Sequence, residues 1–252
     1  MRRRNSFLSA FALLFLACPV WSEPSLVNTT KDITGSSVSQ TSFNVATIAG
    51  DLLVVVAAVS DADARFTVSS AGLAFSEDVF SVGGGSPYIE DSISIWSAPN
   101  VSGGSHMITI RVTGNPNYIR YGALEFENVA TSNHVLDTGT GRGFTSSITT
   151  SSVNTVQSNT LLFAAVRTDG DETAHGAIFA GSGFSLPWSF GNIEPNQKLM
   201  TEYRVADAGT YVSGNVFTMQ SGDGGGWVSL FVAYAPGGVV PSSPTALTIL
   251  PD

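Results

Sequence analysis

LLVVVAAV, residues Leu52–Val59, is an unbroken run of apolar residues that follows a Gly-Asp pair. A similar run, LLFAAV at residues 161–166, follows an Asn-Thr pair. A helix needs about 20 apolar residues to cross a bilayer, so both runs are too short for that role. Because turn-forming residues precede each run, the pattern predicts two strands, each buried on both of its faces.

The sequence around these two runs also recurs, in the same order along the chain. Six segments of the first half each match a segment of the second half, at a spacing of about 107–110 residues. The matched pairs are residues 42–44 with 152–154, 52–53 with 161–162, 71–76 with 181–185, 94–98 with 201–205, 104–112 with 209–219, and 119–129 with 227–237. These matches indicate an internal duplication, with one repeat over about residues 36–130 and the other over about residues 145–237.

Short apolar and alternating segments fill both repeats, and no helical period occurs after the N-terminal segment. Each repeat offers about five strands. We therefore expect an all-β fold: a two-sheet, antiparallel, jelly-roll-like sandwich of about ten strands built from the two repeats. The alternative is two separate domains of about 90 residues each. The connecting segment 130–145 holds apolar residues and no proline-rich linker, which favours a single domain over residues 23–238, followed by a flexible, proline-containing tail at 239–252.

The first 22 residues have the pattern of a secretory signal peptide. Arginines at positions 2–4 form a charged n-region, residues 7–17 form an apolar h-region, and a small residue, Ser22, precedes the expected cleavage point. The h-region is shorter than the roughly 20 residues of a membrane span, so we expect export to the periplasm or the extracellular space and no membrane insertion. A lipoprotein anchored through Cys18 is the alternative, but Phe15 is a poor residue at the first position of such a site.

The chain is acidic, with 20 Asp and Glu against 11 Lys and Arg and a formal charge of −9. Removal of the signal peptide takes away three arginines and no acid, which leaves eight cations against 20 acids and a formal charge of −12. This charge argues against binding to nucleic acid or to an anionic membrane. The one cysteine lies in the signal peptide, so the mature chain would have neither a disulfide nor a thiolate zinc site.

Several short motifs resemble motifs found in a broad group of exported bacterial proteins. These motifs are Gly-Asp-Leu-Leu at 50–53, Trp-Ser-Ala-Pro-Asn at 96–100, Glu-Tyr-Arg-Val at 202–205 and Ala-Gly-Thr-Tyr at 208–211. The similar proteins carry a duplicated, concanavalin-like or jelly-roll β-sandwich domain, and the resemblance covers roughly residues 36–237. It implies a fold and an extracellular setting rather than one activity. Members of that sandwich class often bind carbohydrate or act in surface adhesion, and some cleave glycans.

Two glutamates offer the strongest catalytic arrangement in the sequence. Glycan hydrolysis needs two carboxylates, about 5 Å apart for retention of configuration or about 6.5–9.5 Å apart for inversion. Glu125 and Glu127 lie two residues apart on a predicted strand, which would place them on one face at roughly 6.6 Å. The third acid of the Glu-x-Asp-x-x-Glu pattern of jelly-roll glucanases is replaced by Ala130, so a solvated strand face is the competing interpretation. Glu202 is a further candidate, but Arg204 faces the same way and predicts an ion pair.

The segment RTDGDETAH at residues 167–175 is the candidate metal site. Asp169, Asp171 and Glu172 alternate around a glycine, as the oxygen ligands of a calcium loop do, but the later ligands of an EF-hand are missing. The first repeat has Asp61 and Asp63 at the matching place. A solvated acidic turn is the alternative, so calcium remains an open expectation. None of the three histidines has the spacing of a zinc site, and each is expected on the surface or in a strand.

Flat aromatic side chains stack on sugar rings, so an exposed tryptophan would indicate glycan binding. Trp96 and Trp227 lie in repeat-related strand regions and are expected in the core. Trp188, in SLPWSFGN at residues 185–192, is the one expected on an exposed loop and is our candidate ligand-binding residue.

Three functional hypotheses follow. The first is a secreted, non-enzymatic β-sandwich protein that binds a glycan or another cell-surface ligand in adhesion. The alternative is a glycan-cleaving hydrolase or lyase of the jelly-roll kind, with Glu125, Glu127 and Glu202 as its acids. The third is a structural subunit of an extracellular assembly.

Overall fold

A computed structural model describes residues 22–34, 38–61, 63–83, 91–114, 116, 118–169, 178–189, 197–211, 217–219 and 226–238. These ranges contain eighteen β-strands, and every pairing between them is antiparallel. The prediction of an all-β, antiparallel fold is therefore confirmed. No helix capable of crossing a membrane is found in this part of the chain.

Strands β1 to β8 form the first half of the molecule. Its five-stranded central sheet has the order β1-β8-β3-β6-β5, and its three-stranded outer sheet has the order β2-β7-β4. The strand bounds are β1 Ser25–Ile33, β2 Gln40–Thr47, β3 Leu52–Val59, β4 Phe66–Ser69, β5 Ser76–Val82, β6 Ser92–Ala98, β7 Gly104–Val112 and β8 Ile119–Glu127.

Strands β9 to β18 form the second half. Its five-stranded central sheet has the order β14-β15-β12-β18-β9, and two small outer sheets have the orders β10-β17-β13 and β11-β16. The strand bounds are β9 Val135–Gly143, β10 Ser147–Ile148, β11 Val153–Thr155, β12 Thr160–Asp169, β13 Ile178–Ala180, β14 Ser185–Ser189, β15 Gln197–Ala206, β16 Gly209–Tyr211, β17 Phe217–Met219 and β18 Trp227–Tyr234. In both halves, the apolar run found in the sequence is the middle strand of the central sheet, beside the last strand of its half.

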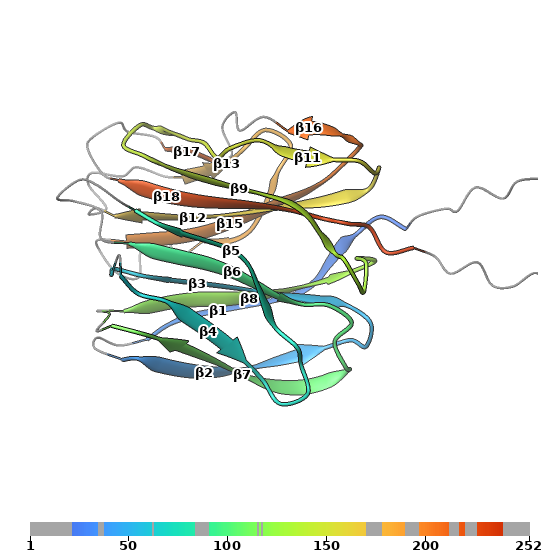
Figure 1. The fold of residues 1–252 in the computed structure, drawn as a ribbon, viewed down its shortest axis with the longest axis horizontal. Helices are drawn as coiled ribbons and strands as arrows, with labels where there is room; N and C mark the ends of the chain where they lie inside the picture. Colours follow the sequence, from blue (N-terminus) through green and yellow to red (C-terminus); the bar gives the residue numbers. More distant parts are fainter. Residues whose placement is uncertain are drawn as a thin grey trace, which may run out of the picture.

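The two central sheets pack face to face, and each carries its outer strands on the far side, one sheet in the first half and two in the second (Figure 1). One core lies between the two central sheets, and the other two lie between each central sheet and its outer sheet. The architecture therefore differs from the expected two sheets and ten strands. The reason is that a central sheet apolar on both faces needs a partner layer on each side. The additional strands are mostly outer ones of two to four residues, too short to give an alternating pattern in the sequence.

Strand β3 shows how the sequence produces this stack. Leu52, Val54 and alternate residues onward enter the core between the two halves, whereas Leu53, Val55 and their alternates enter the core of the first half. All eight residues are at most 1 % exposed. Side chains alternate between the faces of a strand, so the predicted burial on both faces is confirmed.

The strand registers correct one of the sequence matches. Val54 of β3 pairs with Ser97, and Phe163 of β12 pairs with Tyr203. When β3 and β12 are superposed so that their apolar runs coincide, Ser97 and Tyr203 occupy equivalent positions. The sequence match instead sets Ser97 against Arg204, one residue later. A shift of one residue exchanges the two faces of a strand. Glu202, matched to Ile95 in the sequence, is therefore the structural counterpart of Trp96.

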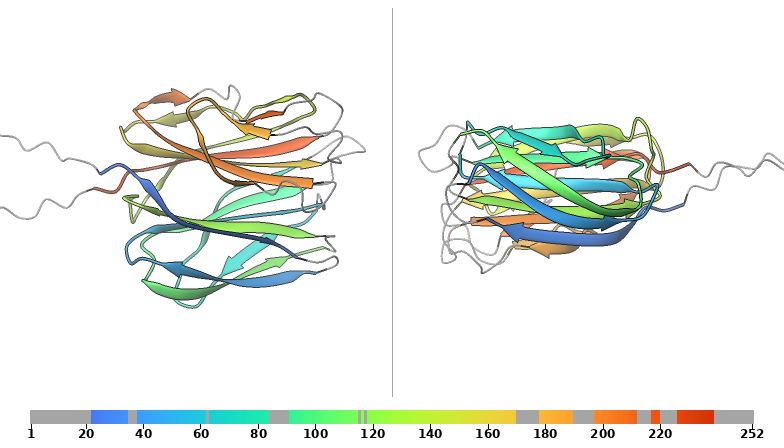
Figure 2. Two further views of the ribbon diagram at one scale, coloured as in Figure 1. Left: turned by 180° about the vertical axis from the view of Figure 1, so that it is seen from behind. Right: turned by 90° about the horizontal axis from the view of Figure 1, so that it is seen from below.

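Residues 128–134, here called the joint, connect the halves and pair with the chain around the end of β18. Val129 forms an isolated bridge with Pro236, and Ala130 N donates to Ala235 O at 2.9 Å. The start of β1 and the end of β18 leave the stack at the same end (Figure 2). The expected signal peptide, except for Ser22, and the expected tail at 239–252 lie outside the described residues.

Candidate functional site

A cavity of about 1010 Å³ opens at the end of the stack where the joint crosses between the halves. The turn between β2 and β3, the joint, and the chain after β18 contribute its walls. Its polar lining consists of two carboxylates, three side-chain amides and small hydroxyls, from Asp51, Glu127, Asn128, Asn133, Gln157, Thr131 and Ser132. Apolar side chains, among them Ile48, Leu136 and Pro236, line the rest of the cavity. Both halves of the molecule therefore supply residues to one cavity of mixed polar and apolar lining.

Three carboxyl groups gather beside this cavity. Asp51 precedes β3 on the same face as Leu53, which pairs with Glu125 of β8, and Glu127 lies two residues further along β8. Glu125 is 1 % exposed, and one of its oxygens accepts a hydrogen bond from Ile48 N, which holds the turn between β2 and β3. Glu127 is exposed and accepts a hydrogen bond from the Ser25 hydroxyl. The two glutamates of the predicted pair thus lie in different environments: Glu125 is buried and holds a turn, whereas Glu127 is open to the cavity.

Asp51 is the residue of this group that the sequence did not single out. It is 7 % exposed, and its Oδ2 has no hydrogen-bond partner. Burial, reinforced by the negative charges of Glu125 and Glu127, raises the pKa of Asp51 to about 6. Around neutral pH this carboxyl group can therefore act as a proton donor or as an acceptor. The sequence feature that could have identified Asp51 is its position immediately before a fully buried strand.

The cavity is suited to a ligand with many hydroxyl groups. Carboxylate oxygens accept hydrogen bonds from hydroxyls, and side-chain amides both donate and accept. No group of three or more acidic, histidine or cysteine residues within the described ranges has a geometry that could hold a metal ion.

The third predicted acid, Glu202, lies elsewhere. It is on β15 in the second half, is completely buried, and accepts a hydrogen bond from Gly181 N at 2.7 Å. Burial raises the pKa of Glu202 to about 8. The expected ion pair with Arg204 is not formed, because the Arg204 guanidinium lies over the rings of Phe184 and Tyr211. The structure therefore does not bring Glu202 together with the two glutamates of β8.

The aromatic predictions have mixed outcomes. Trp227 is 2 % exposed and Trp96 packs against the core of the first half, as expected. The backbone of Trp188 lies in β14, an edge strand, where it pairs with Thr201. The prediction of a loop at Trp188 is wrong, since the Ser-Leu-Pro-Trp-Ser segment forms this strand in spite of its proline, which an edge strand tolerates. The exposure of Trp188 and its role in ligand binding stay predictions.

The predicted calcium ligands are mostly outside the described residues. Asp171 and Glu172 are not described, and for Asp169 only the backbone is, at the end of β12 opposite Gln197. The calcium prediction therefore stays a prediction.

A buried polar network near the joint connects the two halves of the molecule. Ser97 of β6 donates to Asp78 Oδ1 at 2.8 Å, and the Tyr234 hydroxyl donates to Asp78 Oδ2 at 2.6 Å. His134 Nε2 lies 2.7 Å from the Ser97 hydroxyl, and the His134 ring stacks on Tyr234. Burial raises the pKa of Asp78 to about 6 and lowers the pKa of His134. His134 is thus a buried contact between the halves and lies outside any strand, so the expectation of a surface or strand position is wrong for this histidine.

This network differs from the arrangement of a nucleophilic hydrolase. In a catalytic triad the histidine lies between the serine and the acid, so that it can accept the proton of the serine. Here Ser97 lies between Asp78 and His134, and Ser97 is completely buried. The network is therefore suited to joining the halves rather than to nucleophilic attack.

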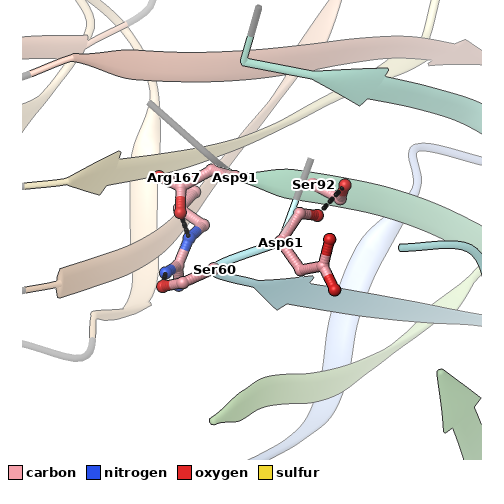
Figure 3. A network of polar contacts seen from close by, with 5 residues as sticks. All are labelled: Ser60, Asp61, Asp91, Ser92 and Arg167. Carbon is pink, nitrogen blue, oxygen red and sulfur yellow. Dashed lines mark hydrogen bonds and ion pairs between the residues drawn. The ribbon is translucent and has the colours of Figure 1, made fainter. Parts of the chain in front are cut away.

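A second contact between the halves lies near the start of β6 (Figure 3). Arg167 Nε of β12 lies 2.8 Å from Asp91 Oδ1, and Arg167 Nη2 donates to the Ser60 hydroxyl. The Nε contact does not have the angle of a directed hydrogen bond, so the pair acts mainly through charge. The available sequence signal was an arginine directly after a fully buried apolar run, because a charge there needs a partner.

Comparisons of this chain with protein-family models, with curated proteins and with solved structures give no match.

Proposed function

We propose that the protein is an exported, non-enzymatic β-sandwich protein that binds a glycan, or another hydroxyl-rich cell-surface ligand, in the end cavity. The observation that supports this proposal best is the polar lining of the cavity of about 1010 Å³ by carboxylates, amides and hydroxyls from both halves. The separation of Glu202 from the two glutamates of β8 weakens the three-acid catalytic alternative.

The experiment is a polysaccharide array with the chain from residue 23 onward, followed by calorimetry on each ligand found. Glu127→Gln and Asn133→Ala change two cavity side chains, and Asp63→Asn removes an exposed acid from the turn after β3 as the matched control. The proposal predicts at least tenfold weaker binding for Glu127→Gln, at least twofold weaker binding for Asn133→Ala and unchanged binding for the control. The reason is that a hydrogen bond to a charged group contributes about 1.5–3 kcal/mol and one between neutral groups about 0.5–1.5 kcal/mol. Absence of any bound glycan, or equal binding by all variants, would reject it.

Glycan cleavage is the second candidate, favoured by one observation. Asp51, whose pKa is raised to about 6, lies beside Glu127 at the cavity, and glycosidases use one acid with a raised pKa next to a second carboxylate. Release of reducing sugar that Asp51→Asn and Glu127→Gln each abolish would establish this activity. Binding without release would leave the non-enzymatic proposal in place.

The duplication, the export and the calcium are also proposals. The equivalent strand orders of the two central sheets support an internal duplication of a jelly-roll-like unit. Cleavage after Ser22, seen by N-terminal sequencing of secreted protein, would support export. Calorimetry with calcium on the wild type and on Asp171→Asn would test the metal site.

A further inference from the structure

The outer sheet of the first half presents polar and cationic side chains to solvent. Its strands β2, β7 and β4 read QTSFNVAT, GSHMITIRV and FTVS, without a single acidic residue, although the chain has 20 acids and 11 lysines and arginines. This sheet forms one outer layer of the stack (Figure 1). Its solvent face presents hydroxyl, amide and guanidinium groups, from Gln40, Ser42, Thr67, Ser69, Thr109 and Arg111, together with one exposed apolar side chain, Met107.

Arg111 lies on the middle strand of this sheet, near one end of the strand. It pairs across β7 with Gln40 on one side and with Thr67 on the other. Its Nε donates to Gln40 Oε1 at 2.9 Å, which orients the guanidinium plane and leaves the two terminal nitrogens for other contacts.

A second arginine, Arg65, lines the same end of the sheet. Arg65 and Arg111 both line a cavity of about 340 Å³, together with Ser39 and Thr113. The Arg65 guanidinium lies 4.3 Å from the centre of the Phe80 ring, and its Nη1 donates to Ala64 O at 2.9 Å. Within the described ranges neither arginine forms an ion pair with a carboxylate. Two oriented guanidiniums with spare donors are what bidentate recognition of a carboxylate or a sulfate requires.

We propose that this cavity and the adjoining hydroxyl-bearing face form a second binding site, which takes an anionic oligosaccharide. The carboxylate or sulfate of one sugar unit would lie between Arg65 and Arg111, and the neighbouring units would follow the hydroxyls of β2, β7 and β4. A short oligosaccharide fits better than a nucleic acid, because two cations on a chain of formal charge −9 attract a long polyanion only weakly. This site is separate from the end cavity, and the proposal does not depend on it.

The experiment is calorimetry on the chain from residue 23 onward with three hexasaccharides: one carboxylated (oligogalacturonate), one sulfated (chondroitin sulfate) and one neutral (maltohexaose). We expect binding of an anionic probe that weakens as salt rises, and no binding of the neutral probe. The carboxylated and sulfated probes distinguish the two sources of charge. Arg65→Gln with Arg111→Gln should weaken binding at least tenfold. Arg142→Gln, which removes an exposed arginine of β9, is the matched control and should change it less than twofold.

Four results would overturn the proposal. The first is that the double variant binds the anionic probe as well as the wild type does, and the second is that the neutral probe binds equally well. The third is tighter binding of single-stranded DNA with the same dependence on the two arginines. The fourth is that Glu127→Gln, rather than the double variant, loses binding. The last result would place the ligand in the end cavity and support the proposed function. If the double variant does not fold, each single variant provides the same comparison, with its melting temperature as the check on folding.

Discussion

Arg167 and Asp91 form an ion pair of 2.8 Å between the two halves of the molecule, and both side chains are at most 1 % exposed. Removal of one member of such a pair leaves an uncompensated buried charge, which costs about 3–5 kcal/mol. We therefore predict that Arg167→Gln lowers the free energy of unfolding by about this amount in urea denaturation. The exposed Arg142→Gln is the control and should change it by less than about 0.5 kcal/mol. Equal stability of the two variants would show that the pair is not formed.

Asp78 predicts a dependence of stability on pH. Its pKa in the folded protein is raised from 3.8 to about 6, so the native state holds the proton more tightly than the unfolded state does. This contribution is fully present below about pH 4 and is lost as the pH rises through about 6, by about 3 kcal/mol at most. Asp78→Asn should lack this part of the pH dependence. The measurement is the difference between the unfolding free energies of the wild type and Asp78→Asn from pH 4 to 8, and a flat difference would contradict the prediction.

Glu202 extends the pH dependence to a higher range. Its pKa is raised from 4.5 to about 8, so its contribution is present below about pH 4.5 and is lost as the pH rises through about 8. Glu202→Gln retains an oxygen that can accept the hydrogen bond from Gly181 N but cannot ionise. We expect this variant to melt at a higher temperature than the wild type at pH 9. The exposed Glu127→Gln is the control, and a lower melting temperature for Glu202→Gln at pH 9 would refute the prediction.

Gly141 of β9 allows the chain to return closely over the central sheet of the second half. A Cβ atom at this position would lie 1.8 Å from the carbonyl oxygen of Thr149, which is backbone and cannot rotate away. Gly141→Ala should therefore destabilise the protein by several kcal/mol, in the range of severe overpacking. Gly209→Ala is the control, because a Cβ there meets only the Tyr211 ring, at 3.9 Å or more. Similar melting temperatures for the two variants would contradict the close approach.

The part of the fold that could be predicted from the sequence is the part with strong local patterns. The apolar runs at Leu52–Val59 and 161–166 are long enough to identify the two central strands and their burial. The outer strands of the second half could not be predicted, because β10 has two residues and β11 has three. The number of layers depends on how the two halves pack against each other, and no single segment of the sequence encodes this packing.

The residues of the candidate sites also divide into those that a local sequence pattern predicts and those that only the fold brings together. Glu125 and Glu127 are two residues apart on one strand, so a local pattern found them together. Asp51 joins them through the pairing of β3 with β8, and Ser97, His134 and Tyr234 meet through contacts between distant segments. The match of residues 94–98 to 201–205 was one residue out of register, since similarity between short strands does not determine which face each residue occupies.

The central claim is that the end cavity binds a glycan, and backbone NMR with a titrated ligand tests it most directly. With a glycan identified on the array, we predict that the amide shifts change at the turn of residues 48–51 and at residues 127–133, and that Glu127→Gln abolishes these changes. Shift changes confined to other surfaces, or none at saturating glycan, would contradict the account.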